Sequence, residues 1–120
     1  SVNQLIDYAK QELRFGSGSN SLRNQLEAVY RQTGVKPPEL DNLIEFPSEM
    51  VYVWEYFLRL NQKRSSNGFG VNPISYTEIK NYFDLMQIFP DPSEVEVISL
   101  LDSVFMEHYA KEQEKNNKKK

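Results

Sequence analysis

The chain has 120 residues, of which 39% are hydrophobic and 26% charged, and its net charge is −3. This composition suits one small globular domain, and it excludes both a two-domain enzyme with a cleft between its halves and a chain that is disordered throughout. Cysteine is absent, which excludes disulfides, thiol catalysis and zinc–thiolate sites.

The first two predicted helices are separated by a flexible run. Apolar residues recur at helical spacing in residues 1–15, and the Gly-Ser-Gly-Ser-Asn run of residues 16–20 ends that pattern. A second helix begins at Ser21 and ends before Gly34, a residue suited to a left-handed C-cap. We treat residues 1–20 as a helix and linker, native or engineered, that need not belong to the domain, and we expect residues 1–15 to be dispensable for folding.

The prolines at positions 37 and 38 prevent the second helix from continuing. They favour an extended surface strap that reaches Pro47. The apolar residues of this strap that we expect to point inward are Leu40, Leu43, Ile44 and Phe46. A third helix over residues 48–64 has an apolar arc centred on Met50, which makes it the predicted central core helix.

A turn-forming loop at residues 65–70 leads to two more predicted helices. Ser75 and Glu78 have the spacing of a capping box, and the helix that they start ends before Pro90. Asp91 and Pro92 then suit the N-cap and first position of a fifth helix, which extends to about residue 109. Residues 111–120, which include five lysines, are predicted to be a flexible tail.

These elements predict an all-α fold, a small bundle of four to five helices with a Pro-Pro surface strap. The helical domain is expected to cover residues 21–110. Its predicted core comprises Trp54, Phe57, Leu58, Ile79, Phe83, Ile98, Leu101 and Phe105. No stretch reaches the roughly 20 apolar residues of a membrane span, and residues 1–10 lack the order of a signal peptide, so we expect a cytoplasmic protein with no membrane partner.

The sequence predicts no catalytic, cofactor or metal site, and we expect the protein not to be an enzyme. His108 is the only histidine. Near the end of a helix its cation is favoured electrostatically, which we prefer to a catalytic interpretation. The Gly-Phe-Gly sequence at residues 68–70 lacks a complete phosphate-binding fingerprint.

Asp102 lies inside the apolar arc of the fifth predicted helix. A buried carboxylate needs hydrogen-bond donors, such as a tyrosine hydroxyl, the Trp54 indole or the amino-terminal end of a neighbouring helix. The alternatives are a solvated position at the edge of the arc and a contact with a partner.

The side of the third helix opposite the core carries the predicted protein-binding residues Tyr52, Tyr56 and Arg59, with Phe69 in the following loop. Tyrosines are enriched in protein interfaces because they combine apolar area with a polar tip. The alternative is that a neighbouring strap covers both rings.

The chain shows a succession of a helix, a Pro-Pro strap, an aromatic helix, a Gly-rich loop and an Ile-Ser-Tyr helix. The segments concerned are residues 22–34, 37–40, 53–60, 73–79, 94–95 and 100–102. Taken in this order, they resemble small tail assembly chaperones of long-tailed bacteriophages. The chain departs from them at Val53, Tyr56 and Tyr76, where such proteins often have tryptophan.

The resemblance implies a chaperone that binds the tail-tube protein, the tape-measure protein or both during tail assembly in the host cytoplasm. Within such families the domain can be part of a longer frameshifted product, and we favour the downstream, tube-recruiting part. Self-association is left open.

Two other functions compete with this interpretation. A helix-turn-helix DNA-binding regulator would use the fourth and fifth helices, but residues 81–110 contain no Lys or Arg and six Asp or Glu. That charge repels phosphates, so we expect no specific nucleic acid partner. A structural tail-completion protein that stays in the virion is the second alternative.

Overall fold

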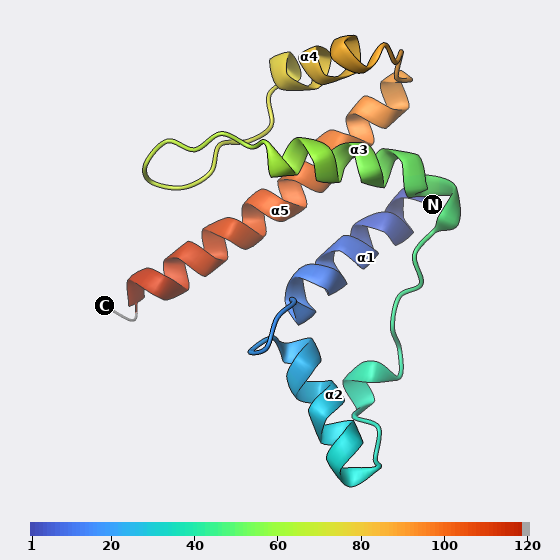
Figure 1. Cartoon of the computed structure of the whole chain (residues 1–120), viewed down its shortest axis with the longest axis vertical. Coiled ribbons are helices and arrows are strands. Elements are labelled where there is room, and N and C mark those ends of the chain that lie inside the picture. The colour runs from blue at the N-terminus through green and yellow to red at the C-terminus, as the bar shows by residue number, and fades with distance from the viewer. Residues whose placement is uncertain (119–120) are drawn as a thin grey trace. The chain divides into compact units, whose positions relative to one another are not determined.

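The computed structural model describes residues 1–118, which fold into helices joined by turns and loops (Figure 1). The α-helices are α1 (Val2–Phe15), α2 (Leu22–Thr33), α3 (Val51–Gln62), α4 (Tyr76–Met86) and α5 (Pro92–Lys118). Short 3-10 helices cover Pro38–Leu40 and Ser48–Met50, and the β pairing within residues 1–118 is limited to a bridge between Ser66 and Val71. The predicted all-α fold class is confirmed. Over the same residues, no helix combines the length and the apolar character needed to cross a membrane.

Local sequence signals account for where the helices begin and end. Ser75 and Glu78 form the predicted capping box, with bonds of 3.1 Å from the Glu78 amide to the Ser75 hydroxyl and 3.0 Å from the Ser75 amide to the Glu78 carboxylate. Gly34 ends α2 with φ of 71°, a left-handed conformation that glycine adopts without strain. The Asp91 amide donates to the Glu94 carboxylate at 3.0 Å as α5 begins.

Residues 3–47 form one compact unit, and residues 48–118 belong to another. The boundary between compact units therefore falls after Pro47, whereas the sequence suggested a separation after residue 20. In the first unit α1 is the buried element, since Leu5, Ala9 and Phe15 have almost no exposed surface.

The Gly-Ser run does not isolate α1 from the strap of residues 37–47. The Gln11 side chain accepts a hydrogen bond of 2.7 Å from the Ile44 amide and donates one of 3.4 Å to the Ile44 carbonyl. The Tyr8 ring packs edge-on against Phe46 with 5.1 Å between the centroids. Of the strap residues predicted to point inward, Leu43 is exposed, so that prediction is wrong at this position.

Gln11→Ala is expected to lower the free energy of unfolding of this unit by about 1–3 kcal/mol, because the Ile44 amide loses its acceptor and a buried side chain is removed. Amide hydrogen exchange should accelerate at Ile44 in the same variant. Gln25→Ala, at an exposed position of α2, is the matched control. Equal exchange rates at Ile44 in the wild type and in Gln11→Ala would contradict this account of how α1 holds the strap.

The second unit is built on α3, which packs against α5 and, over a shorter stretch, against α4 (Figure 1). Its buried core comprises Val53, Phe57, Leu60, Ile79, Phe83, Val97, Ile98, Leu101 and Phe105. The predicted core is wrong at Trp54 and Leu58, which are half-buried. The buried side of α3 follows Val53, Phe57 and Leu60, so these two residues flank it.

The prediction of a flexible tail from residue 111 is wrong for residues 111–118, which continue α5. Nothing in this segment breaks a helix, and Lys, Glu and Gln are good helix formers. Ion pairs one turn apart support it, at 3.2 Å between Lys111 and Glu107 and 3.3 Å between Lys118 and Glu114. Residues 119–120 of the predicted tail lie outside the described residues.

Asp102 is buried and forms the structural hydrogen bond that the sequence suggested. Its Oδ2 accepts a bond of 3.1 Å from the Ile74 amide, just before α4. Its Oδ1 lies 2.6 Å from Nη1 of Arg64, which is also buried; this contact is an ion pair rather than an aligned hydrogen bond. The pair joins the end of α3, the segment before α4 and the middle of α5.

Candidate protein-binding surface

Tyr52 lies in the first turn of α3 and is 69% exposed. The core side of α3 is given by Val53 and Phe57, and Tyr52 projects away from it. A ring this exposed contributes little to the packing of the domain. Tyr52 therefore remains a candidate anchor for a partner.

Tyr56, one turn further along α3, is half-buried against α4. Its ring packs edge-on against Phe83 with 5.0 Å between the centroids, and lies 6.3 Å from the Tyr82 ring. The alternative prediction, that another part of the chain covers the ring, is therefore correct for Tyr56. The part that covers it is the helix α4 rather than the strap. Tyr52 is not covered in this way.

Arg59 is exposed on the same side of α3. Its Nη1 donates to the Tyr82 hydroxyl at 3.4 Å, and this bond raises the pKa of the Arg59 guanidinium above its usual value. Arg59, which like any arginine is charged at neutral pH, therefore lies beside the Tyr82 ring, which in turn contacts Tyr56. We call Tyr52, Tyr56, Arg59 and Tyr82 the α3 face.

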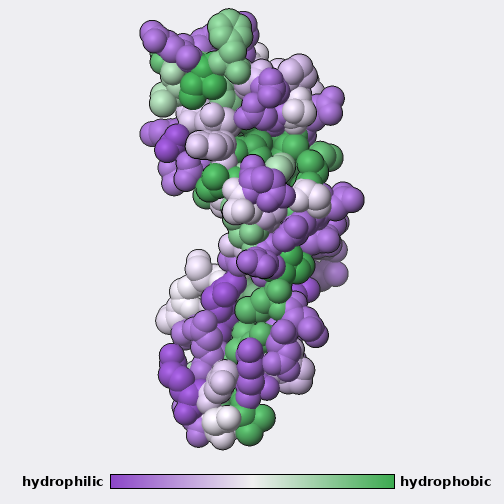
Figure 2. All heavy atoms as spheres, turned by 90° about the vertical axis from the view of Figure 1, so that its right-hand side faces the viewer, coloured by the Kyte–Doolittle hydropathy of each residue, from purple (hydrophilic) through white to green (hydrophobic). Residues whose placement is uncertain are grey.

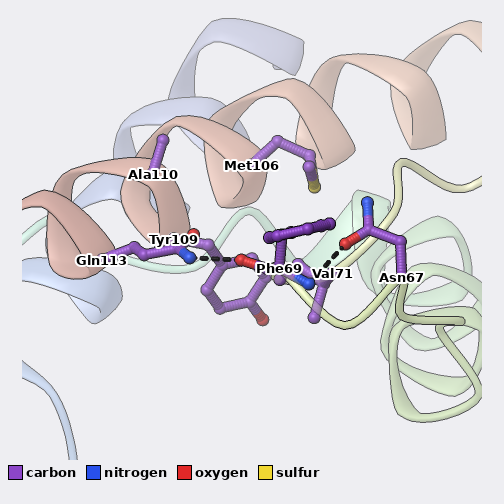
Figure 3. A pocket seen from close by; sticks show the side chains of 8 residues that line it. Asn67, Phe69, Val71, Met106, Tyr109, Ala110 and Gln113 are labelled. Carbon is purple, nitrogen blue, oxygen red and sulfur yellow. Dashed lines mark hydrogen bonds between the residues drawn. The ribbon is translucent and has the colours of Figure 1, made fainter.

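Phe69 does not join the α3 face. It lies in the loop after the C-terminal end of α3, where it lines a small pocket with Met106 and Tyr109 of α5 (Figure 3). The Gln113 side chain donates to the Phe69 carbonyl, and the Asn67 side chain accepts from the Phe69 amide at 2.9 Å. Gly68 has φ of 87°, which favours glycine in this turn. The loop is thus held by hydrogen bonds while the Phe69 ring remains 84% exposed.

The structure also exposes large apolar side chains on α4 and on the turn between α4 and α5, none of which is among the predicted binding residues. They are Tyr76, Leu85, Met86 and Phe89. Hydrophobic atoms are visible at the surface at the top of Figure 2, at the height where Figure 1 draws α4 and this turn. The signal in the sequence was the motif Phe89-Pro90-Asp91-Pro92, in which an aromatic residue sits beside two prolines between helices.

Among residues 1–118 no three His, Asp or Glu side chains are grouped so that they would hold a metal ion. His108 stacks edge-on near Tyr109, with 6.0 Å between the rings. What the α3 face offers is exposed aromatic area together with the Arg59 cation, and tyrosine and arginine are enriched in protein-binding sites.

The structure is thus that of a small all-α protein with exposed aromatic side chains on the neighbouring helices α3 and α4. The chain belongs to the phage tail assembly chaperone family, whose model matches residues 29–107. The match begins within α2 and ends within α5. No curated protein and no solved structure matches the chain.

Proposed function

We propose that this chain binds the tail-tube protein in the host cytoplasm during tail assembly, with the tape-measure protein as the second candidate client, and that it does so without catalysis. The exposure of Tyr52 beside Arg59 on the α3 face carries the proposal. Membership of the phage tail assembly chaperone family supports the general role, and the choice of client is our inference from the resemblance.

The α3 face suits transient capture of a folded or partly folded client. Tyr52 offers apolar area at a small cost in side-chain entropy, since its ring has only two rotatable bonds. Tyr56 and Tyr82 form a firm base through their ring contact, and Arg59 supplies a cation that can pair with a carboxylate of the client. Phe69 is a separate contact at the far end of α3, and we keep it as a predicted binding residue.

The test is capture of purified tail-tube protein, and separately of tape-measure protein, by the immobilised chain. Tyr52→Ala should weaken capture about fivefold or more, because anchor residues contribute about 1 kcal/mol or more. The far-ultraviolet circular dichroism should be unchanged, since the ring is exposed. Tyr52 is the cleaner position because replacing Tyr56 by alanine would also remove its packing on Phe83.

Tyr30→Ala is the matched control, since Tyr30 is an exposed tyrosine on α2, outside the α3 face. Equal loss of capture in Tyr30→Ala and Tyr52→Ala would place the interface elsewhere. Failure of the wild-type chain to capture either client would contradict the proposed function itself.

A further inference from the structure

A groove with a volume of about 700 Å³ lies along α4 and the turn into α5. We call it the α4 groove. Its apolar lining comprises Tyr76, Ile79, Phe83, Ile88, Phe89 and Val95. Ile79 and Phe83 form a buried floor, while Tyr76 and Phe89 are exposed at its sides. A volume of this size is enough to take several side chains of a partner.

Phe89 has no measurable burial within the chain, at 102% relative exposure. An isolated exposed phenylalanine is unremarkable, but this one lies in a groove with other apolar residues, so its exposure forms part of a patch. No part of the described chain covers the Phe89 ring, so its burial would require another molecule.

The backbone around Phe89 is held firmly. The Ile88 amide donates to the Phe83 carbonyl at 3.0 Å and the Gln87 amide to the Asp84 carbonyl at 3.2 Å, a Schellman arrangement that closes α4. Gln87 adopts the left-handed conformation with φ of 58°, although it is not glycine. Pro90 follows Phe89 and restricts it further. Little backbone freedom is left to lose on binding, which favours affinity.

The residues that follow the groove in the sequence are acidic. Of the groove's own lining, Lys80 and Asp84 carry opposite charges and form an ion pair at 2.6 Å, so the lining has no net charge. From residue 81 to residue 110 there is no Lys or Arg, and Asp91, Glu94 and Glu96 lie close in sequence to the groove residues Pro90 and Val95. The complementary partner is therefore cationic. A second copy of this chain would bring the same acidic charges together, which disfavours self-association through this groove.

We propose that the α4 groove binds an amphipathic helix of a client protein, with an apolar stripe flanked by Lys or Arg. The apolar stripe fills the groove over Ile79 and Phe83, Phe89 packs against it as the main anchor, and the basic flanks lie over the acidic surround. A helix fits better than a strand because α4 and α5 present side chains here and no sheet edge is available among residues 76–98. The inference rests on the proposed client-binding function but not on the α3 face.

The test uses a fluorescein-labelled 14-residue helical peptide of leucine and lysine as the probe, with anisotropy of the full chain as the readout. We expect the wild-type chain to bind it, and Phe89→Ala to weaken binding by at least about tenfold, as expected for an anchor residue. Leu85→Ala is the matched control, since Leu85 is 84% exposed on the same helix but does not line the groove. It should change affinity less than about twofold.

A second peptide, with glutamate in place of each lysine, tests the charge. It should bind at least about tenfold more weakly, and added salt should weaken the lysine peptide, because the acidic surround is exposed to solvent. Equal losses in Phe89→Ala and Leu85→Ala, or equal affinity for both peptides, would overturn the proposal. So would dimerisation of the wild-type chain that Phe89→Ala abolishes, since the occupant would then be a second copy.

Failure of this inference and failure of the proposed function give different results. A chain that captures a tail protein but does not bind the lysine peptide overturns the groove as the docking site and leaves the proposed function standing. A chain that binds the peptide through Phe89 and captures neither the tail-tube nor the tape-measure protein supports the groove and contradicts the proposed clients.

Discussion

Phe57→Ala is expected to lower the free energy of unfolding by about 3–5 kcal/mol, the range for removing a large aromatic side chain from a packed core. Phe57 has no exposed surface, and its ring packs edge-on against Phe105 of α5 with 4.7 Å between the centroids. The substitution therefore removes packing between α3 and α5 and leaves a cavity at their contact. Urea unfolding followed by circular dichroism measures the loss.

Tyr52→Ala is the control on the same helix, because Tyr52 is largely exposed and its replacement should change the free energy of unfolding by less than about 0.5 kcal/mol. A loss below about 1 kcal/mol in Phe57→Ala would show that α3 is not the central helix of its unit.

The starts of α4 and α5 and the end of α2 were predictable because the signals for them are local. Ser75 with Glu78, and Asp91 with Pro92, start α4 and α5 through contacts within one turn, so nothing distant in the sequence is needed to recognise them. Gly34 ends α2 for a similar reason.

Predictions that depended on packing between elements were less successful. The apolar arc of α3 is broad, and the sequence alone does not say which part of it faces α5; the buried side follows Leu60 rather than Trp54 and Leu58. The Gly-Ser run indicated a flexible join, yet Gln11 holds the strap at Ile44, a residue 33 positions away. Such contacts are determined by tertiary structure, and composition does not reveal them.

The candidate surface was predicted in part. The position of Tyr52 opposite the core of α3 follows from helical periodicity, and the structure exposes it. The cover over Tyr56 comes from Phe83 on α4, and Phe69 turns toward α5, so the four predicted residues do not form one patch. The α4 groove was missed because Phe83 and Ile88 look like ordinary core residues in the sequence.

The Arg64–Asp102 pair was also recognised only in part. The position of Asp102 in an apolar arc indicated that its carboxylate needs a hydrogen-bond donor. The sequence did not identify Arg64 as its partner, because Arg64 lies 38 residues earlier, at the end of the third predicted helix. Besides Asp102, the structure gives Arg64 two further acceptors: Asn61 Oδ1 accepts from its Nε at 3.0 Å and its Nη2 at 2.8 Å, and the Asn72 carbonyl accepts from its Nη1 at 2.9 Å. Asn61, a polar residue near the C-terminal end of α3, therefore serves to hold the Arg64 guanidinium.

Arg64→Met is expected to cost about 3–5 kcal/mol in the free energy of unfolding, because it leaves the Asp102 carboxylate buried without its cation. Asp102→Leu should cost a similar amount, since it leaves the guanidinium buried and the Ile74 amide without an acceptor. The double variant should lose clearly less than the sum of the two, because neither charge then remains buried alone. Urea unfolding of the four proteins measures this coupling, and additive losses would show that the two side chains are stabilised independently. In either case the double variant should be somewhat less stable than the wild type. It lacks the bonds from Arg64 to Asn61 and Asn72, and these bonds hold the end of α3 to the following loop.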